Sequence, residues 1–105
     1  MIKLVATDID GTIFIPEKEF TLEVKNCIKK LSNNGIKVVL VTGRMNAAAS
    51  RIAKDLELDT PVVSYQGGLV VENGKTLYER YLTEEQTSRI LEWAKVSEKN
   101  IHING

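Results

Sequence analysis

Three short apolar runs alternate with two amphipathic stretches over the first 64 residues, and this alternation constrains the fold more than any other feature. Strands are predicted at 2–7, 36–41 and 62–64, and helices at about 22–34 and 46–57. The 36–41 run is rich in β-branched residues, as is typical of a parallel strand that is covered on both faces. Strands that alternate with helices form parallel sheets through right-handed crossovers. The sequence therefore predicts an α/β fold with a parallel sheet.

The pattern changes after residue 64. Two strand-like runs, 68–72 and 75–79, flank Asn73-Gly74. Asn-Gly between two such runs is a strong signal for a β-hairpin with a tight turn. The sequence therefore predicts that a hairpin follows the third parallel strand.

A second unit is predicted beyond the hairpin. Thr83 and Gln86 have the spacing of a capping box, which predicts a helix over about 84–97. A further strand is expected to begin at 101–103. Residues 80–82 read as a boundary, so the expected units are 1–81 and 82–105.

Charge and cysteine content limit the possible partners. Lysine and arginine together number 14, as do aspartate and glutamate, so the formal net charge is zero. This balance argues against broad binding to nucleic acid or to an anionic membrane, and it leaves little repulsion against self-association. No signal peptide or membrane-spanning run is evident.

Cys27 is the single cysteine and cannot form an internal disulfide. This composition fits the reducing cytoplasm. Cys27 shares the i, i+3, i+4, i+7 spacing of one helical face with Val24, Ile28 and Leu31. It is therefore expected in the core.

Asp8 and Asp10 come directly after the first apolar run and are followed by Gly11 and Thr12. In open α/β sheets, ligands lie just beyond the carboxyl ends of the strands. Side chains one residue apart leave an extended strand on the same side, and Gly11 permits an immediate turn. Two carboxylates placed there suit Mg²⁺ and phosphate chemistry. The alternative is a solvated turn that ends the strand; a calcium-binding EF-hand loop would need acidic residues at other spacings.

Thr42, Gly43 and Arg44 follow the second predicted strand. A hydroxyl and a backbone amide at this point could both donate to a phosphate oxygen. An ordinary turn with a surface arginine is the alternative. Because neighbouring strands lie about 5 Å apart, parallel pairing would bring Thr42 close to Asp8.

Three ordered motifs together resemble the haloacid dehalogenase superfamily, and most closely its Cof-type sugar-phosphatase branch. They are Asp8-Ile9-Asp10-Gly11-Thr12, then Val41-Thr42-Gly43-Arg44, and then Tyr65-Gln66-Gly67-Gly68 before the hairpin. The resemblance covers nearly the whole chain. It implies a three-layer, Rossmann-like core, here incomplete, over residues 1–81, and the start of an α/β cap over 82–105. Gln66 departs from the Asn-Gly usual at its motif, which leaves open any substrate contact from that loop.

The resemblance also implies roles for individual residues. Asp8 would be the nucleophile that forms an aspartyl-phosphate, and Asp10 the general acid and base. Asp8 and Asp10 would hold Mg²⁺, the latter through its backbone carbonyl. Thr42, Gly43 and Arg44 would form the phosphate-binding loop, with Arg44 orienting a loop or approaching the substrate. The implied activity is hydrolysis of a small phosphorylated metabolite.

Members of this superfamily carry two further segments: a later lysine, and a Gly-Asp sequence with nearby acids. The 105 residues contain neither. We therefore expect weak Mg²⁺ binding and little activity from this chain alone. A non-catalytic fragment or assembly module that needs a separate C-terminal half is the alternative function. The first strand would lie at an unpaired edge of the sheet, which favours a homo-oligomer or association with that half.

Two weaker possibilities complete the sequence-based hypotheses. A response-regulator receiver also uses a phosphorylated aspartate, but its acceptor lies on a later strand, where only Asp59 is available. His102 is the single histidine, and a metal role is not expected of it. The receiver remains a distant third hypothesis.

Overall fold

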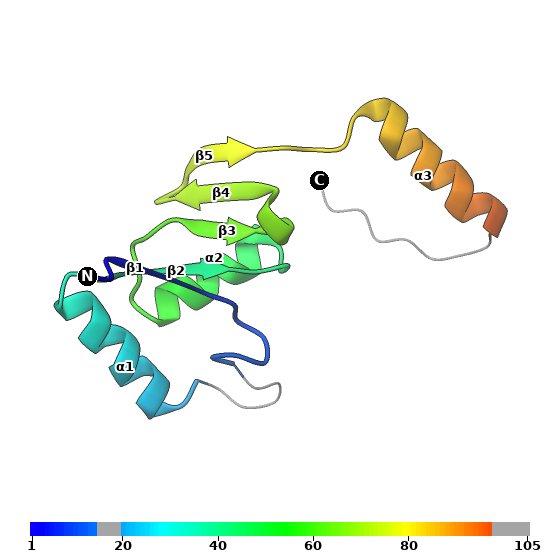
Figure 1. The fold of residues 1–105 in the computed structure, drawn as a ribbon. Helices are drawn as coiled ribbons and strands as arrows, with labels where there is room; N and C mark the ends of the chain where they lie inside the picture. The colour runs from blue at the N-terminus through cyan, green and yellow to red at the C-terminus, as the bar shows by residue number, and fades with distance from the viewer. Residues whose placement is uncertain (15–19, 98–105) are drawn as a thin grey trace.

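The computed structural model describes residues 1–14 and 20–97. This part of the chain contains five strands and three α-helices, which alternate as far as β3 (Figure 1). Their bounds are β1 Leu4–Thr7, α1 Leu22–Asn33, β2 Lys37–Val41, α2 Asn46–Asp55, β3 Val62–Ser64, β4 Leu69–Glu72, β5 Lys75–Glu79 and α3 Glu84–Ser97, with a short 3₁₀ turn, η1, at Tyr65–Gly67. All three helices and five strands lie where the sequence predicts them, within three residues at each end. The expected strand at 101–103 lies outside the described residues.

The strands form one sheet in the order β1-β2-β3-β4-β5. The first three are parallel, and the β4–β5 hairpin continues the sheet in antiparallel pairing. This arrangement confirms the predicted parallel sheet and hairpin. Because Thr7 pairs with Leu40 in the register, the carboxyl ends of β1 and β2 lie side by side. The residues just after these two strands are therefore neighbours in space.

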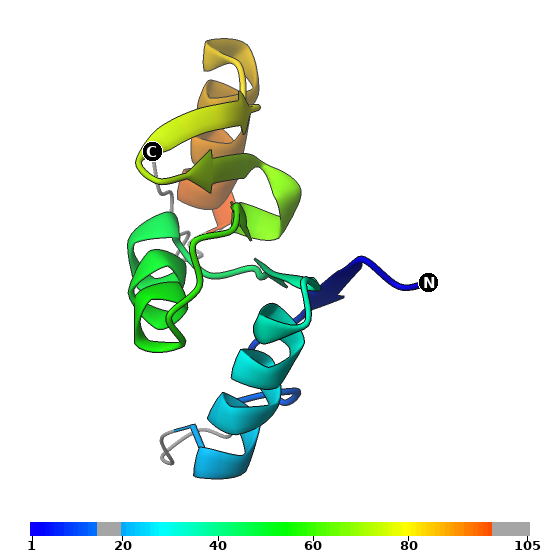
Figure 2. The same ribbon diagram turned by 90° about the vertical axis from the view of Figure 1, so that its left-hand side faces the viewer.

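Helices α1 and α2 pack on the same face of the sheet, as Figure 2 lets the reader follow. The buried cluster beneath them joins Ile28 of α1 and Ile52 of α2 to Val38 and Leu40 of β2. Two right-handed crossovers that advance in one direction along a sheet put both helices on one side. The α/β, Rossmann-like class is confirmed, and sheet and helices supply two of the three expected layers. On the other face Leu4 and Val41 are 54% and 38% exposed.

Local capping explains where the helices begin. The Thr21 hydroxyl accepts a hydrogen bond from the Val24 amide (3.2 Å) and so caps α1. The Thr83 backbone amide donates to Gln86 Oε1 at 2.9 Å, and the Gln86 backbone amide donates to Thr83 Oγ1 at 3.1 Å. This reciprocal pair confirms the predicted capping box of α3. Helix α2 ends at Asp55, two residues earlier than predicted, because Glu57 adopts a left-handed backbone (φ 57°).

The prediction that Cys27 lies in the core is wrong. Cys27 is exposed, whereas Ile28, one position further along α1, is buried. Successive residues of a helix are turned by about 100°, and α1 buries only a narrow stripe against the sheet. Cys27 lies at the margin of the apolar stripe that the periodicity predicts. The sheet covers the part of the stripe that contains Ile28 and leaves Cys27 exposed.

Strand β1 lies at the edge of the sheet and pairs only with β2 among the described strands, as predicted. At the other end, α3 follows an extended segment and stands away from the sheet (Figure 1). No helix in the described ranges is long and apolar enough to cross a membrane.

Candidate functional site

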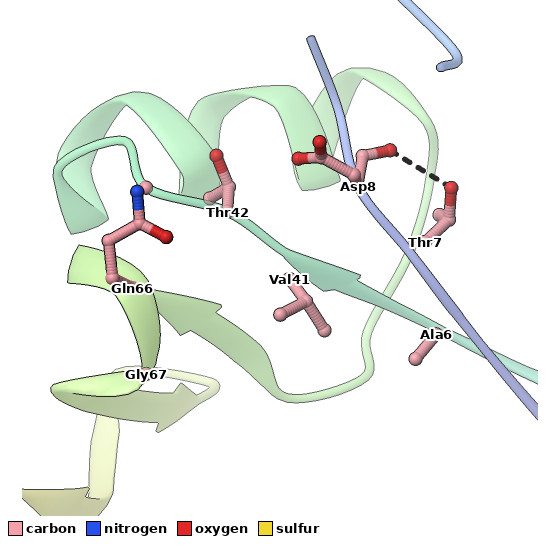
Figure 3. A pocket seen from close by; sticks show the side chains of 8 residues that line it. Ala6, Thr7, Asp8, Val41, Thr42, Gln66 and Gly67 are labelled. Atoms are coloured by element: carbon pink, nitrogen blue, oxygen red, sulfur yellow. Dashed lines mark hydrogen bonds between the residues drawn. The ribbon is translucent and has the colours of Figure 1, made fainter. Parts of the chain in front are cut away.

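Two adjoining cavities open where β1 and β2 end. The first, of about 450 Å³, is lined by Ala6, Thr7, Asp8, Val41, Thr42, Gly43, Gln66 and Gly67 (Figure 3). The second, of about 390 Å³, is lined by Asp8, Asp10, Thr42, Gly43, Arg44 and Gln66. Asp8, Thr42, Gly43 and Gln66 belong to both. The five candidate residues named from the sequence are thus brought together beyond the carboxyl ends of β1 and β2.

Asp8 is exposed, and its carboxylate points toward Thr42 (Figure 3). One oxygen, Oδ1, accepts a hydrogen bond from the backbone amide of Ile9 at 2.8 Å. The side chain of Ile9 is fully buried in the core. The buried Ile9 therefore anchors the carboxylate of Asp8 through its backbone amide, while that carboxylate faces the cavities.

Thr42 is 4% exposed, so its hydroxyl is buried at the floor of the site. The Thr42 Oγ1 atom accepts a hydrogen bond from the Arg44 amide at 3.0 Å, which closes a tight turn after β2. A hydroxyl can accept and donate at the same time. Because the amide occupies a lone pair, the O–H proton of Thr42 can be donated to an oxygen in the cavity.

The η1 turn is joined to this turn by backbone hydrogen bonds. The Gln66 amide donates to the Thr42 carbonyl (3.1 Å), and the Tyr65 amide donates to the Arg44 carbonyl (3.0 Å). Gln66 holds a left-handed backbone, φ 57° and ψ 34°, which is costly for a residue with a Cβ. Its carboxamide lies against Gly43, where any added Cβ would collide with it. The sequence marks Gln66 only as a departure from the family motif and does not predict its place in both cavities.

Asp10 and Arg44 form a two-point ion pair at the mouth of the second cavity. Arg44 Nε donates to Asp10 Oδ2 at 2.8 Å, and Nη2 donates to Oδ1 at 2.5 Å. The side chains are 47% and 32% exposed. Hydrogen bonding from Arg44 lowers the pKa of the Asp10 carboxyl below its usual range, and the same bonding raises the pKa of Arg44. The pair holds Asp10 as a carboxylate.

Phe14 adjoins the site through Arg44, although nothing in the sequence indicates it. The guanidinium carbon of Arg44 lies 5.2 Å from the centre of the Phe14 ring. Phe14 in turn packs at 5.2 Å against Phe20, with the rings tilted by 53°. No local sequence pattern predicts this contact, because Phe14 and Arg44 are 30 residues apart in the chain.

The donor set can be compared with the needs of Mg²⁺. In the described part of the chain, no three acidic, histidine or cysteine side chains gather in a way that could hold a metal ion. Mg²⁺ is often held by one or two carboxylates together with waters and substrate phosphate. The carboxylate of Asp8, which faces the cavities, is a donor of this kind. The Asp10 carboxylate is already engaged by Arg44.

The chain is similar to several known proteins. A family model described as haloacid dehalogenase-like hydrolase matches residues 5–105. A candidate phosphatase of Streptococcus pyogenes serotype M6 is 36% identical over 101 residues, which cover 86% of this chain and 38% of the relative. The 5-amino-6-(5-phospho-D-ribitylamino)uracil phosphatase YwtE of Bacillus subtilis is 30% identical over 101 residues, with 96% and 34% covered.

Structural similarity agrees with these relatives. The solved structure of a haloacid dehalogenase-like hydrolase from B. subtilis superposes with a TM-score of 0.82 at 28% identity, over 92% of this chain and 34% of that one. The chain thus spans roughly a third of the length of the curated relatives it matches.

Proposed function

Because the chain belongs to the haloacid dehalogenase-like hydrolase family, we propose that it carries the phosphate-handling part of a Mg²⁺-dependent phosphatase for a small phosphorylated metabolite. One observation carries the proposal: Asp8 and Thr42, from the ends of adjacent parallel strands, line the same two cavities.

Asp8 is the proposed nucleophile. A carboxylate oxygen attacks phosphorus, the bond from phosphorus to the ester oxygen breaks, and an aspartyl-phosphate forms. Thr42 donates its hydroxyl proton in a hydrogen bond to a phosphate oxygen, beside Gly43 and Arg44 in the proposed phosphate-binding loop. Thr42 and Gly43 position the phosphoryl group in line with Asp8, and positioning together with electrostatic stabilisation accounts for most catalysis of this kind.

Asp10 is the proposed general acid and base. Paired with Arg44 it is a carboxylate, the base form, which takes a proton from the water that attacks the aspartyl-phosphate. To act as the acid it must first bind a proton, which it then gives to the departing alkoxide. The products are an alcohol, inorganic phosphate and free Asp8. The Asp8 carboxylate and the Asp10 carbonyl would hold Mg²⁺, which shields the phosphate charge that otherwise repels the attacking carboxylate.

The relatives suggest which substrates to try first. YwtE, YitU and YcsE of B. subtilis are each named as a 5-amino-6-(5-phospho-D-ribitylamino)uracil phosphatase. A phosphorylated ribityl compound is therefore a first choice beside a generic phosphomonoester. We propose that residues 82–105 begin a separate cap unit that would help to select the substrate, because α3 follows an extended segment beyond the sheet.

The first experiment compares the wild-type chain with Asp8→Asn in phosphomonoester hydrolysis with Mg²⁺. Asparagine is close in shape to aspartate and cannot form the acyl phosphate. We expect any wild-type activity to be low and to be lost in Asp8→Asn. Equal rates in the two proteins would remove the hydrolase proposal for this chain.

A second candidate function is a non-catalytic module that needs a separate C-terminal half. It is favoured by the length of the relatives and by the exposed face of the sheet. The test adds a polypeptide that carries the missing lysine and acidic segments. Activity that appears only in the mixture, and not with Asp8→Asn, would support this function.

A further inference from the structure

The side chain of Arg44 is held on two sides. Two guanidinium nitrogens, Nε and Nη2, bind the two oxygens of the Asp10 carboxylate, and the guanidinium lies over the ring of Phe14. Two parallel charge-assisted hydrogen bonds fix the orientation of a carboxylate as well as its distance. An arginine stacked on an aromatic ring loses further freedom. The orientation of Asp10 is thus set by Arg44, a residue from outside its own turn.

Phe14 reaches this position through a tight turn that begins at Asp10. The Gly11 amide donates to the Phe14 carbonyl at 2.9 Å, and the Ile9 carbonyl accepts from the amides of Ile13 (3.1 Å) and Phe14 (3.0 Å). An isolated bridge also joins Asp10 to Phe14. The turn therefore returns the chain beside Asp10 and places an aromatic ring beneath the arginine that holds it.

The geometry leaves Arg44 poorly placed to bind phosphate. The edge of the guanidinium best suited to two-point recognition of an oxyanion already faces Asp10. To bind phosphate in the same way, Arg44 would have to break both hydrogen bonds and uncover Asp10. The Thr42 hydroxyl, whose proton can be donated to the cavity, needs no such rearrangement.

We propose that Arg44, supported by the ring of Phe14, is a positioning residue that orients the Asp10 carboxylate and is not itself a phosphate ligand. The inference rests on the proposed function, in which Asp10 handles the proton. It refines the role of Arg44 within the phosphate-binding loop. It also assigns a role to Phe14, whose ring would be the support that lets a long, partly exposed side chain hold one orientation.

The first test is spectroscopic and needs no activity. Nuclear magnetic resonance of ¹⁵N-labelled protein should show an Arg44 Nε–H signal that is protected from exchange with water. Exchange should become about tenfold faster in Asp10→Asn and in Phe14→Leu, because each removes one side of the support. The matched control is Arg51→Lys, at an exposed position of α2, which should leave the signal unchanged. An Arg44 signal that is indifferent to Asp10→Asn or to Phe14→Leu would overturn the proposal.

A second comparison separates orientation from charge. Arg44→Lys keeps the positive charge but cannot span both oxygens of Asp10. The backbone amide resonances of Asp10 and Gly11 should therefore shift as far in Arg44→Lys as in Arg44→Met. Wild-type positions in Arg44→Lys would mean that the charge alone suffices, and the positioning role would be lost.

The third test uses inorganic phosphate with Mg²⁺ as the probe, measured by calorimetry. Arg44→Met should keep the phosphate affinity within about twofold, whereas Thr42→Val should lose about tenfold, or 1.4 kcal/mol. A tenfold loss in Arg44→Met would make Arg44 a phosphate ligand and overturn the proposal. If wild type binds no phosphate, the proposed function fails for this chain, and the two spectroscopic comparisons still decide the Arg44–Asp10–Phe14 arrangement.

Discussion

Arg44 holds both carboxylate oxygens of Asp10 across 34 residues of sequence, at 2.8 and 2.5 Å. This ion pair ties the turn after β1 to the turn after β2 at the mouth of the second cavity. The η1 turn is tied to the same place through the hydrogen bond from Gln66 to the Thr42 carbonyl. Three turns, each following a different strand, are therefore connected by hydrogen bonds. A substitution in one turn should alter the geometry of the other two.

Thr42→Val should weaken both the fold and the site. The substitution removes the oxygen that accepts from the Arg44 amide, and loss of a buried acceptor costs about 1–2 kcal/mol in the free energy of unfolding. The matched control is Thr42→Ser, which keeps the hydroxyl. Urea unfolding measures the stability and calorimetry the phosphate affinity. Equal phosphate binding by the valine and serine variants would contradict a role for the hydroxyl.

Gln66→Gly should stabilise the fold by up to about 1 kcal/mol, because glycine adopts the left-handed backbone without steric cost. Glu57→Gly is the matched control, since Glu57 has the same φ of 57° and lies away from the cavities. Denaturant unfolding should show a gain in both variants. A gain in Glu57→Gly with a loss in Gln66→Gly would show that the Gln66 side chain contributes packing against Gly43.

The hydroxyl of Tyr81 should lose its proton at a higher pH than that of an unperturbed tyrosine. Its hydroxyl donates to Glu79 Oε2 at 3.0 Å, and this hydrogen bond raises the pKa of Tyr81 above its usual value of about 10. The stabilising contribution is complete below the unfolded pKa and is lost as the pH rises through the folded one. Absorbance at 295 nm, with Tyr81→Phe to identify the group, should show a lower midpoint in Glu79→Gln. An unchanged midpoint would mean that the hydrogen bond is absent in solution.

Leu4→Glu should reduce self-association. Leu4 is 54% exposed on edge strand β1, and its register partner on β2 is Lys37, so a glutamate there meets a favourable charge within the monomer. Exposed apolar edge strands favour pairing between chains. Sedimentation at micromolar concentration should show a lower mean mass for Leu4→Glu than for wild type or for Leu91→Glu, a control on α3. A wild-type chain that is already monomeric would refute the predicted assembly.

Much of the fold could be predicted because its signals are local. Helix periodicity, the Thr83–Gln86 capping box and the Asn73-Gly74 turn each depend on residues within a few positions of one another. Prediction was less accurate where packing decides, as with Cys27. The periodicity of α1 gives a face of a certain width, but the sheet decides how much of that face is covered.

The sequence alone determined the order of strands and helices and the placement of Asp8 and Thr42 at strand ends, since parallel strands deliver their carboxyl ends to one edge. Tertiary structure alone decided that Arg44 holds Asp10, that Phe14 supports Arg44, and that Gln66 covers Gly43. These contacts join side chains from turns far apart in the chain. No local preference encodes them, because each depends on the distance between strands and on the rotamers that the assembled turns allow.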